Sequence, residues 1–189
     1  MDTKLIIQGT PNPNALKFVL NIPVIAQGNV TYKSVEDCKH NPLAKIIFEL
    51  DHAVKEVYFF DNYITVSQDG STDWDTLENK IQQTILAEIE KHDLNFNIET
   101  ADKSAKSVIE SSPELDKINT ILDETVRPAL QMDGGDIQLI NYKDKNLKVF
   151  YQGACGSCPS AAMGTLQAIE NILKDQFDPE ISVELADTI

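Results

Sequence analysis

Two cysteines three residues apart, Cys155 and Cys158, have the spacing in this chain that is best suited to chemistry. They belong to residues 153–160, which read GACGSCPS and are called the CxxC segment below. Pro159 suits the first turn of a helix, so we expect Cys158 near a helix N-cap. Unpaired backbone N–H groups and the positive end of the helix dipole favour a thiolate there. We therefore expect the pair to be deprotonated, and either to react or to bind a metal.

The residues on either side of the CxxC segment predict the elements that position it. Apolar residues alternate along the stretch before it, which is typical of a strand, and recur at helical spacing after it. The strand set is Leu147, Val149 and Tyr151, and the helix set is Ala162, Leu166, Ile169 and Leu173. The CxxC segment is thus predicted at a strand-to-helix junction.

Further elements upstream and downstream complete a domain around this junction. Ser112 opens a predicted helix that Arg127-Pro128 should kink or end. The other predicted elements are a tight turn over 132–136 (MDGGD), a strand over 137–142, a hairpin turn over 143–146 and a last strand over 181–185. This order of helix, strand, strand, helix, strand predicts an α+β domain over residues 113–189.

The N-terminal half predicts a second small α+β domain, over residues 1–98. Its order is strand, strand, helix, strand, strand, helix, and the stretch 22–33 gives no clear element apart from some strand character at 30–32. The predicted strands cover 5–8, 16–20, 54–60 and 63–68; the helices carry apolar stripes of Leu43, Ile46, Ile47 and Leu50, and of Trp74, Leu77, Ile81, Ile85 and Ile89. Residues 99–112 are polar and small, so they predict a linker.

Composition excludes several classes of function. The chain has 189 residues, 42% of them hydrophobic, and Lys+Arg of 16 against Asp+Glu of 30 gives a net charge of -14. No basic patch is available for nucleic acid or anionic lipid, and no stretch approaches the roughly 18 apolar residues of a membrane span. The first residues hold no apolar signal region, so we expect a cytoplasmic protein. In that reducing compartment a close cysteine pair is more often catalytic or metal-binding than structural.

Several motifs resemble the Nfu-type iron–sulfur assembly proteins. The N-terminal motifs are PNPNALKF at 11–18, NPLA at 41–44 and the helix opening at Asp73-Trp74; the C-terminal ones are Arg127-Pro128, DGGD at 133–136 and the CxxC segment, as in a NifU C-terminal domain. They span essentially the whole chain in the order of that family. Organellar members carry a targeting peptide, whereas this chain begins at the domain itself, which favours a bacterial cytoplasm.

The resemblance implies a scaffold or carrier, and not an enzyme. It would hold a cluster, typically [4Fe-4S], between two subunits through Cys155 and Cys158, and pass it from an upstream donor to apo-proteins. Ligand counting points the same way, because a cubane needs about four ligands and each chain offers this pair and a distant Cys38. A symmetric homodimer supplies the other two thiolates.

Two alternatives remain open at this point. A thioredoxin-like dithiol oxidoreductase also has a CxxC at a helix start, but the 31 residues after Cys158 are too few for the rest of its sheet. A zinc-bridged interaction module would use the same four thiolates, because zinc accepts the same sulfur ligands.

Other candidate residues have plain structural interpretations. Two glycines in the DGGD motif allow positive φ at a helix exit. We expect His40, His52 and His92 on the surface, and Cys38 as a small, semi-buried residue.

Overall fold

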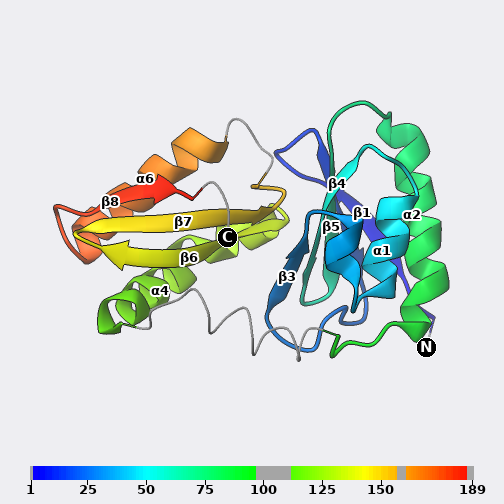
Figure 1. The fold of residues 1–189 in the computed structure, drawn as a ribbon, viewed down its shortest axis with the longest axis horizontal. Coiled ribbons are helices and arrows are strands. Elements are labelled where there is room, and N and C mark those ends of the chain that lie inside the picture. Colours follow the sequence, from blue (N-terminus) through cyan, green and yellow to red (C-terminus); the bar gives the residue numbers. More distant parts are fainter. Residues whose placement is uncertain (1, 97–111, 157–160, 187–189) are drawn as a thin grey trace. The chain divides into compact units, whose positions relative to one another are not determined.

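The computed structural model describes residues 2–96, 112–156 and 161–186. The chain forms two compact units, residues 1–99 and 100–189, which are described one at a time (Figure 1). The predicted linker falls largely on residues 97–111, which lie outside the described residues. The predicted boundaries of the domains stay predictions.

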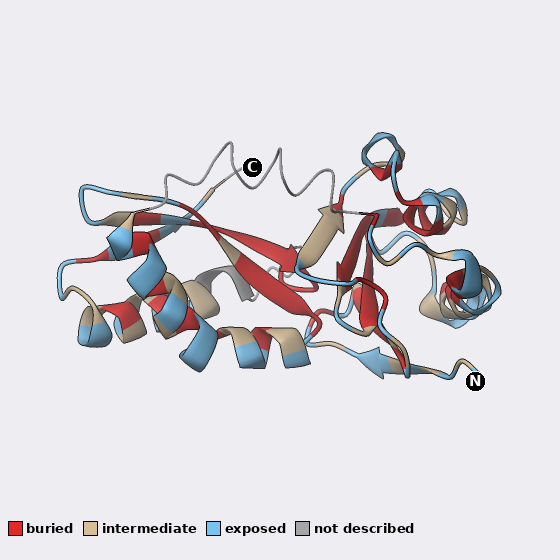
Figure 2. Cartoon of the chain, turned by 90° about the horizontal axis from the view of Figure 1, so that it is seen from below, coloured by how far each residue is buried: buried red, intermediate tan, exposed pale blue. Residues whose placement is uncertain are grey.

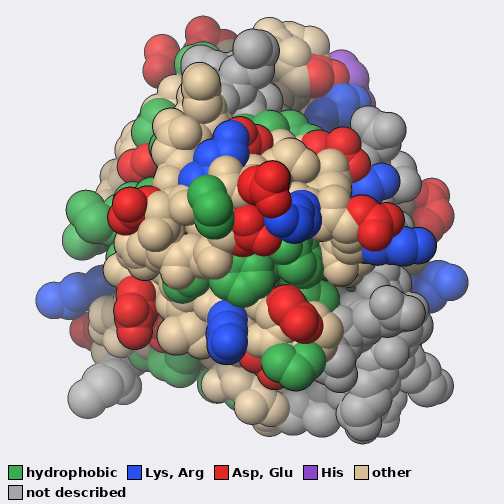
Figure 3. Space-filling view, turned by 90° about the vertical axis from the view of Figure 1, so that its left-hand side faces the viewer, with side chains coloured by type: hydrophobic (Ala, Val, Ile, Leu, Met, Phe, Trp, Pro, Cys, Tyr) green, Lys and Arg blue, Asp and Glu red, His purple; other side chains and the backbone are tan. Residues whose placement is uncertain are grey.

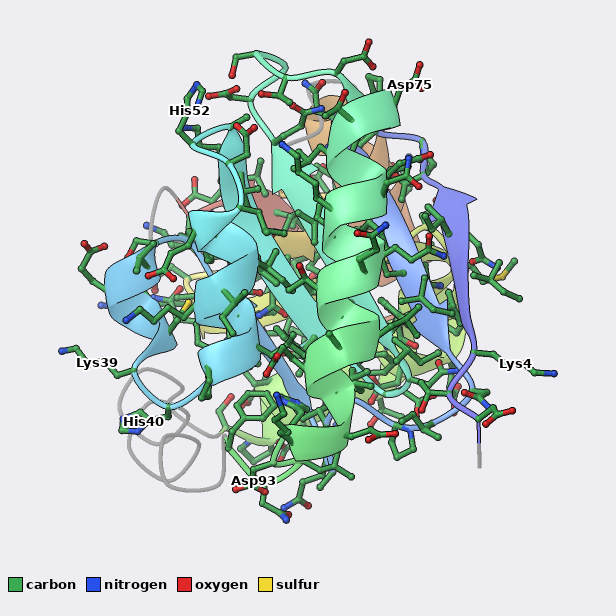
Figure 4. The ribbon with its side chains drawn as sticks, turned by 90° about the vertical axis from the view of Figure 1, so that its right-hand side faces the viewer. Lys4, Lys39, His40, His52, Asp75 and Asp93 are labelled. Carbon is green, nitrogen blue, oxygen red and sulfur yellow. The ribbon has the colours of Figure 1, made fainter. Side chains whose placement is uncertain are left out.

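The first unit is a five-stranded sheet with two helices packed on one face (Figures 1 and 4). The strand order is β1-β2-β5-β4-β3, and every neighbouring pair is antiparallel. The strands are β1 (Leu5–Gly9), β2 (Ala15–Leu20), β3 (Asn29–Tyr32), β4 (Val54–Phe60) and β5 (Tyr63–Gln68). The helices are α1 (Pro42–Glu49) and α2 (Trp74–Glu88), with 3-10 turns at Val35–Cys38 and Ile89–Lys91.

Local sequence explains where these helices begin. The Asn41 side chain accepts a hydrogen bond from the backbone N–H of Ala44 at 3.1 Å, and Pro42 occupies the first turn of α1. Asp73 caps α2 in the same way, through the N–H of Asp75 at 3.1 Å. The predicted apolar stripe of α2 is buried at Leu77, Ile81 and Ile85.

The apolar stripe of α1 differs from its prediction. Ala44 and Phe48 are buried, whereas Ile46 and Leu50, which were expected on the inner face, are only half-buried. An eight-residue helix is short enough for two overlapping stripes to fit its periodicity. Packing of α1 on β4 and α2 selects between them.

The second unit is a three-stranded sheet covered on one face by helices. The strand order is β6-β7-β8, with β6 and β7 antiparallel and β7 and β8 parallel. The elements are α4 (Pro113–Thr125), α5 (Arg127–Met132), β6 (Gly135–Lys143), β7 (Asn146–Gly153), α6 (Ala161–Gln176) and β8 (Ser182–Leu185). Figure 2 shows that buried residues concentrate along the strands and on the inner faces of the helices.

One hydrophobic core joins the helices to the sheet in this unit. Ile118 and Leu122 of α4 and Ile169 and Leu173 of α6 are fully buried in it, together with inward residues of the three strands. The strand residues in the core are Ile137, Leu139, Leu147, Val149, Tyr151 and Val183. The prediction of two small α+β domains is therefore confirmed as a fold class, with the short helix α5 added after the break at Arg127-Pro128.

Charges of both signs share the surface of this unit. On the face in Figure 3, Lys and Arg side chains are interspersed with Asp and Glu and form no continuous basic area. Lys145 pairs with Asp178 at 3.7 Å, and Lys148 with Glu184 at 3.4 Å. Within the described parts of the chain, none of the helices has the length and apolar character needed to cross a membrane. Exclusion of nucleic acid and membrane as partners stays a prediction.

Candidate metal centre

Cys155 lies in a tight turn at the end of β7. Gly153 has a left-handed backbone (φ 61°), and the N–H of Gly156 donates to the carbonyl oxygen of Gly153 at 3.0 Å. The Cys155 side chain is only 7% exposed and belongs to the core of the second unit. Cys158 lies outside the described residues, as does the N-cap predicted for it. The assignment of Cys155 and Cys158 as a ligand pair therefore stays a prediction.

The DGGD turn (residues 133–136) lies directly against the Cys155 thiol. Gly135 pairs with Gly153 across β6 and β7. A Cβ atom on Gly135 would lie 2.5 Å from Cys155 Sγ and 2.8 Å from the carbonyl oxygen of Gln152, both well inside van der Waals contact. Only glycine at position 135 lets the Cys155 thiol and the Gln152 carbonyl approach β6 this closely.

The two glycines of this turn are needed for different structural reasons. Gly134 has φ 81°, as the sequence predicted for a helix exit, whereas Gly135 does not have a positive φ. The carbonyl oxygen of Gly134 accepts a hydrogen bond from the N–H of Ala154 at 3.1 Å. That bond ties the DGGD turn to the residue just before Cys155.

A buried ion pair fixes the DGGD turn to α5. The side chain of Asp136 is 3% exposed, and its Oδ1 lies 3.3 Å from Nε of Arg127, whose side chain is 15% exposed. Gln131 Nε2 donates to the other carboxylate oxygen at 3.3 Å, and the N–H of Ile137 donates to Oδ1 at 2.7 Å. Arg127 also donates to the carbonyl oxygen of Ile137 at 3.1 Å and pairs with Asp123. A buried carboxylate satisfied in this way holds the start of β6 in place.

Sequence reasoning gave no role to this network or to Gly135. Both motifs contributed to the family resemblance, but the residues themselves predicted a helix break at Arg127-Pro128 and a turn at DGGD. The signal available was that both motifs combine a charged residue with backbone-restricting residues close to the predicted cysteine strand. The contact of Arg127 with Asp136 depends on how α5 packs on β6, and the contact of Gly135 with Cys155 depends on the exact register of the predicted hairpin. Local patterns fix neither of them.

Tyr151 is a further neighbour of Cys155. It is 4% exposed on the core face of β7, and burial raises the pKa of its hydroxyl, with the nearby Cys155 thiol acting in the same direction. Thr165 on α6 acts in the opposite direction on this pKa. The phenol is therefore neutral at physiological pH and is a hydrogen-bond donor.

Cys38 is a different kind of cysteine and lies in the first unit. It is 1% exposed, and its thiol donates to the carbonyl oxygen of Ser34 at 3.3 Å. Burial, with Asp37 and Glu36 adding to it, raises its pKa to about 12. A thiol that stays protonated is a poor metal ligand, which favours a structural role for Cys38, although the residue is fully buried where a semi-buried one was predicted.

The histidines form no metal set. His40 and His52 are exposed and point outward from well-separated parts of the first unit (Figure 4). His92 was expected on the surface, but it is half-buried: its ring stacks on Phe59 at 5.7 Å, and Nε2 lies 2.8 Å from the carbonyl oxygen of Val24. Burial lowers its pKa. Within the described residues no three His, Cys, Asp or Glu side chains gather as a metal site.

Two family models match the chain. The model described as "Scaffold protein Nfu/NifU N terminal" matches residues 5–92, and the model described as "NifU-like domain" matches residues 118–184. The second match includes the DGGD turn and the CxxC segment.

Curated relatives match almost the whole chain. "NFU1 iron-sulfur cluster scaffold homolog, mitochondrial" of Drosophila willistoni is 31% identical over 179 residues, covering 94% of this chain and 61% of the relative. "NifU-like protein 4, mitochondrial" of Arabidopsis thaliana is 31% identical over 170 residues, covering 88% of this chain and 60% of the relative. The chain spans about three fifths of the length of these relatives. A solution structure of a NifU-like protein from Saccharomyces cerevisiae aligns at 21% identity and a TM-score of 0.44, covering 49% of this chain and 83% of that one.

The expected cytoplasmic location is contradicted by these relatives, whose names are mitochondrial. That expectation rested on the absence of an apolar signal region and on a sequence that begins at the domain itself. The first observation argues against secretion alone, and the second does not decide between the cytoplasm and an organelle.

Proposed function

Since the chain belongs to the Nfu-type family, which joins an Nfu/NifU N-terminal domain to a NifU-like domain, we propose that it is an iron–sulfur cluster scaffold or carrier. Cys155 and Cys158 hold the cluster, which is cargo, and the protein catalyses no reaction of its own. The observation that carries the proposal is the position of the Cys155 thiol, held in a tight turn against a glycine that leaves it room.

The surroundings of Cys155 suit a sulfur-ligated cluster. Its thiol lies beside the DGGD turn, where a residue larger than Gly135 would displace it. The buried side chain of Tyr151 lies on the same face of β7. Each thiol loses its proton when its sulfur bonds to iron. The fixed DGGD turn means that little reorganisation is needed when this happens.

The cluster is of the [4Fe-4S] type and is shared between two chains. Four-iron clusters take about four thiolates, and each chain supplies two. Cys38 does not add a third, because it is buried and its pKa is raised to about 12. A homodimer with two ligands from each subunit satisfies the cluster.

The same ligand count favours transfer to other proteins. A cluster held by two thiolates from each of two separable chains is released when the chains part, whereas four ligands in one chain would retain it. Exchange of thiolates with an apo-protein then moves the cluster onward, after an upstream donor has supplied it.

Anaerobic reconstitution with iron and sulfide tests this function. We expect a brown protein with about two irons per chain, as a shared four-iron cluster requires. Cys155→Ser and Cys158→Ser should each abolish loading, whereas Cys38→Ala is the matched control and should load normally. A colourless protein that binds zinc in preference to iron would support the zinc module, and reduction of a disulfide substrate by the dithiol would support an oxidoreductase. Either result contradicts the scaffold.

A further inference from the structure

The short helix α5 turns an apolar face to the solvent. Leu130 packs inward, in the core of the second unit. Arg127 is the one charged residue of the helix, and its side chain is only 15% exposed because it is held in the pair with Asp136. The outward residues are apolar and exposed, and they are called the α5 face below: Pro128, Ala129 and Met132.

Met132 is the most prominent residue of the α5 face. It is 78% exposed, which is more than any other large hydrophobic residue in the described part of the chain; Ile6 follows at 64%. Single exposed apolar residues are common on protein surfaces, but an uncharged helix face next to a candidate site calls for an occupant. Methionine is enriched at protein interfaces, because its flexible side chain adapts to the surface that it meets.

The α5 face lies close to the thiol of Cys155. Met132 is three residues from Gly135, where an added Cβ would lie 2.5 Å from Cys155 Sγ. Consecutive Cα atoms are 3.8 Å apart, so the Cα of Met132 is at most about 15 Å from the sulfur. The long side chain of Met132 can span part of this distance. A protein that approaches the thiol closely therefore also approaches the α5 face.

A second copy of the chain is the protein that has to approach this thiol. One chain offers Cys155 and Cys158, whereas a four-iron cluster takes about four thiolates, so the site is incomplete until another copy adds its own pair. In a symmetric dimer both copies use the same surface, so each brings its α5 face to the region around the cluster.

The charge of the second unit favours contact at an uncharged surface. Residues 113–189 contain 6 Lys and Arg against 13 Asp and Glu, so two copies repel one another over most of this unit. The α5 face carries no charge, and the exposed Asp133 that follows it marks its edge. An apolar contact with a polar border is the usual composition of an interface.

We propose that the α5 face is part of the interface with a second copy of the chain, and that Met132 packs against that copy beside the shared cluster. The proposal rests on the proposed function. Three side chains bury far less than the roughly 1,200 Å² of a stable interface, so the α5 face does not hold the empty protein together. It strengthens the dimer only once iron–sulfur bonds join the two chains.

Met132→Ser in the full-length protein is the decisive variant, and Met132→Leu tests rescue by another apolar side chain. Ile6→Ser is the matched control, since Ile6 is exposed to a similar extent but lies on β1 in the first unit. Wild type and variants are reconstituted anaerobically with iron and sulfide over a range of protein concentrations. Sedimentation gives the fraction of loaded dimer, and urea titrations give the stability of the empty proteins.

We expect Met132→Ser to weaken the loaded dimer without affecting the fold. The protein concentration at which half of the chains form loaded dimer should rise about 30-fold, because a symmetric dimer loses two buried methionine side chains. Met132→Leu should stay close to wild type, since it keeps the apolar volume. Ile6→Ser should match wild type. All of the empty proteins should unfold at the same urea concentration, because the substituted side chains are exposed.

Other outcomes overturn the proposal in distinguishable ways. If Met132→Ser forms loaded dimer like wild type, the α5 face lies outside the interface, although the proposed function stands. If that variant also passes its cluster to an apo-ferredoxin more slowly, the α5 face binds acceptors and not a second copy. Equal weakening in Ile6→Ser would show a general effect of losing an exposed apolar residue. If wild type takes up no cluster or loads as a monomer, the shared cluster fails first and the proposal falls with it.

Discussion

Replacing Gly135 by alanine tests the close contact between the DGGD turn and the thiol. The new Cβ would lie 2.5 Å from Cys155 Sγ, 2.8 Å from the Gln152 carbonyl oxygen and 3.0 Å from Cys155 Cβ. Ordinary contacts between such atoms begin at about 3.5 Å, so the first overlap is roughly 1 Å. Alanine adds no φ penalty, because Gly135 does not have a positive φ. The effect of Gly135→Ala therefore reports the contact alone.

The size of the effect follows from which atoms can move. Rotation of the Cys155 side chain would relieve the contact with Sγ at little cost, but it would carry the thiol away from its place. The Gln152 oxygen is backbone in β7 and moves only if β6 and β7 separate locally. Overpacking of this kind costs about 1–3 kcal/mol. For a unit of this size, 2 kcal/mol corresponds to a fall in melting temperature of about 10 °C.

The assay combines stability with loading. Thermal unfolding of the empty Gly135→Ala variant should show the lower melting temperature, and anaerobic reconstitution should give less iron per chain than wild type. Gly164→Ala is the matched control, since Gly164 lies on α6 with no atom within 4 Å of an added Cβ. There the same change should stabilise by about 0.5–1 kcal/mol, the usual gain in a helix. A Gly135→Ala variant that melts and loads like wild type would refute the reasoning.

Three further predictions concern the network, the domain and the assembly. Asp136→Asn breaks the buried pair with Arg127 and should lower the unfolding free energy by about 2 kcal/mol in urea titrations. Glu184→Gln removes the exposed pair with Lys148 and should lower it by less than about 1 kcal/mol. Equal losses in the two variants would contradict the role of burial. The isolated segment 113–189 contains its own core and should take up the cluster alone; a folded segment that stays empty would refute the domain assignment. Loading should convert monomer to dimer in sedimentation experiments, because chains of net charge -14 repel one another until iron–sulfur bonds join them. A chelator should convert the dimer back to monomer. A loaded monomer with about four irons would contradict the shared cluster.

Local patterns predicted the elements well because they depend on residues close in sequence. Alternation along β7 and the cap at Asn41-Pro42 placed a strand and a helix as the structure has them. The failures involve contacts between distant residues. His92 was expected on the surface because nothing near it in sequence shows that it packs on Phe59.

The contact between Gly135 and Cys155 depends on a register that periodicity alone would misplace. The hairpin turns at Asp144-Lys145, whose φ values of 51° and 64° suit a two-residue turn, and counting back from it without interruption would set Gly135 opposite Ala154. A bulge between Leu139 and Asn141 shifts the pairing by one residue, so Gly135 faces Gly153. A one-residue slip exchanges the two faces of a strand. The bulge therefore keeps inward residues of β6 opposite inward residues of β7 both before and after it, and it also places Gly135 beside the Cys155 thiol. The extra residue in β6 is therefore as necessary to the site as the glycine that it positions.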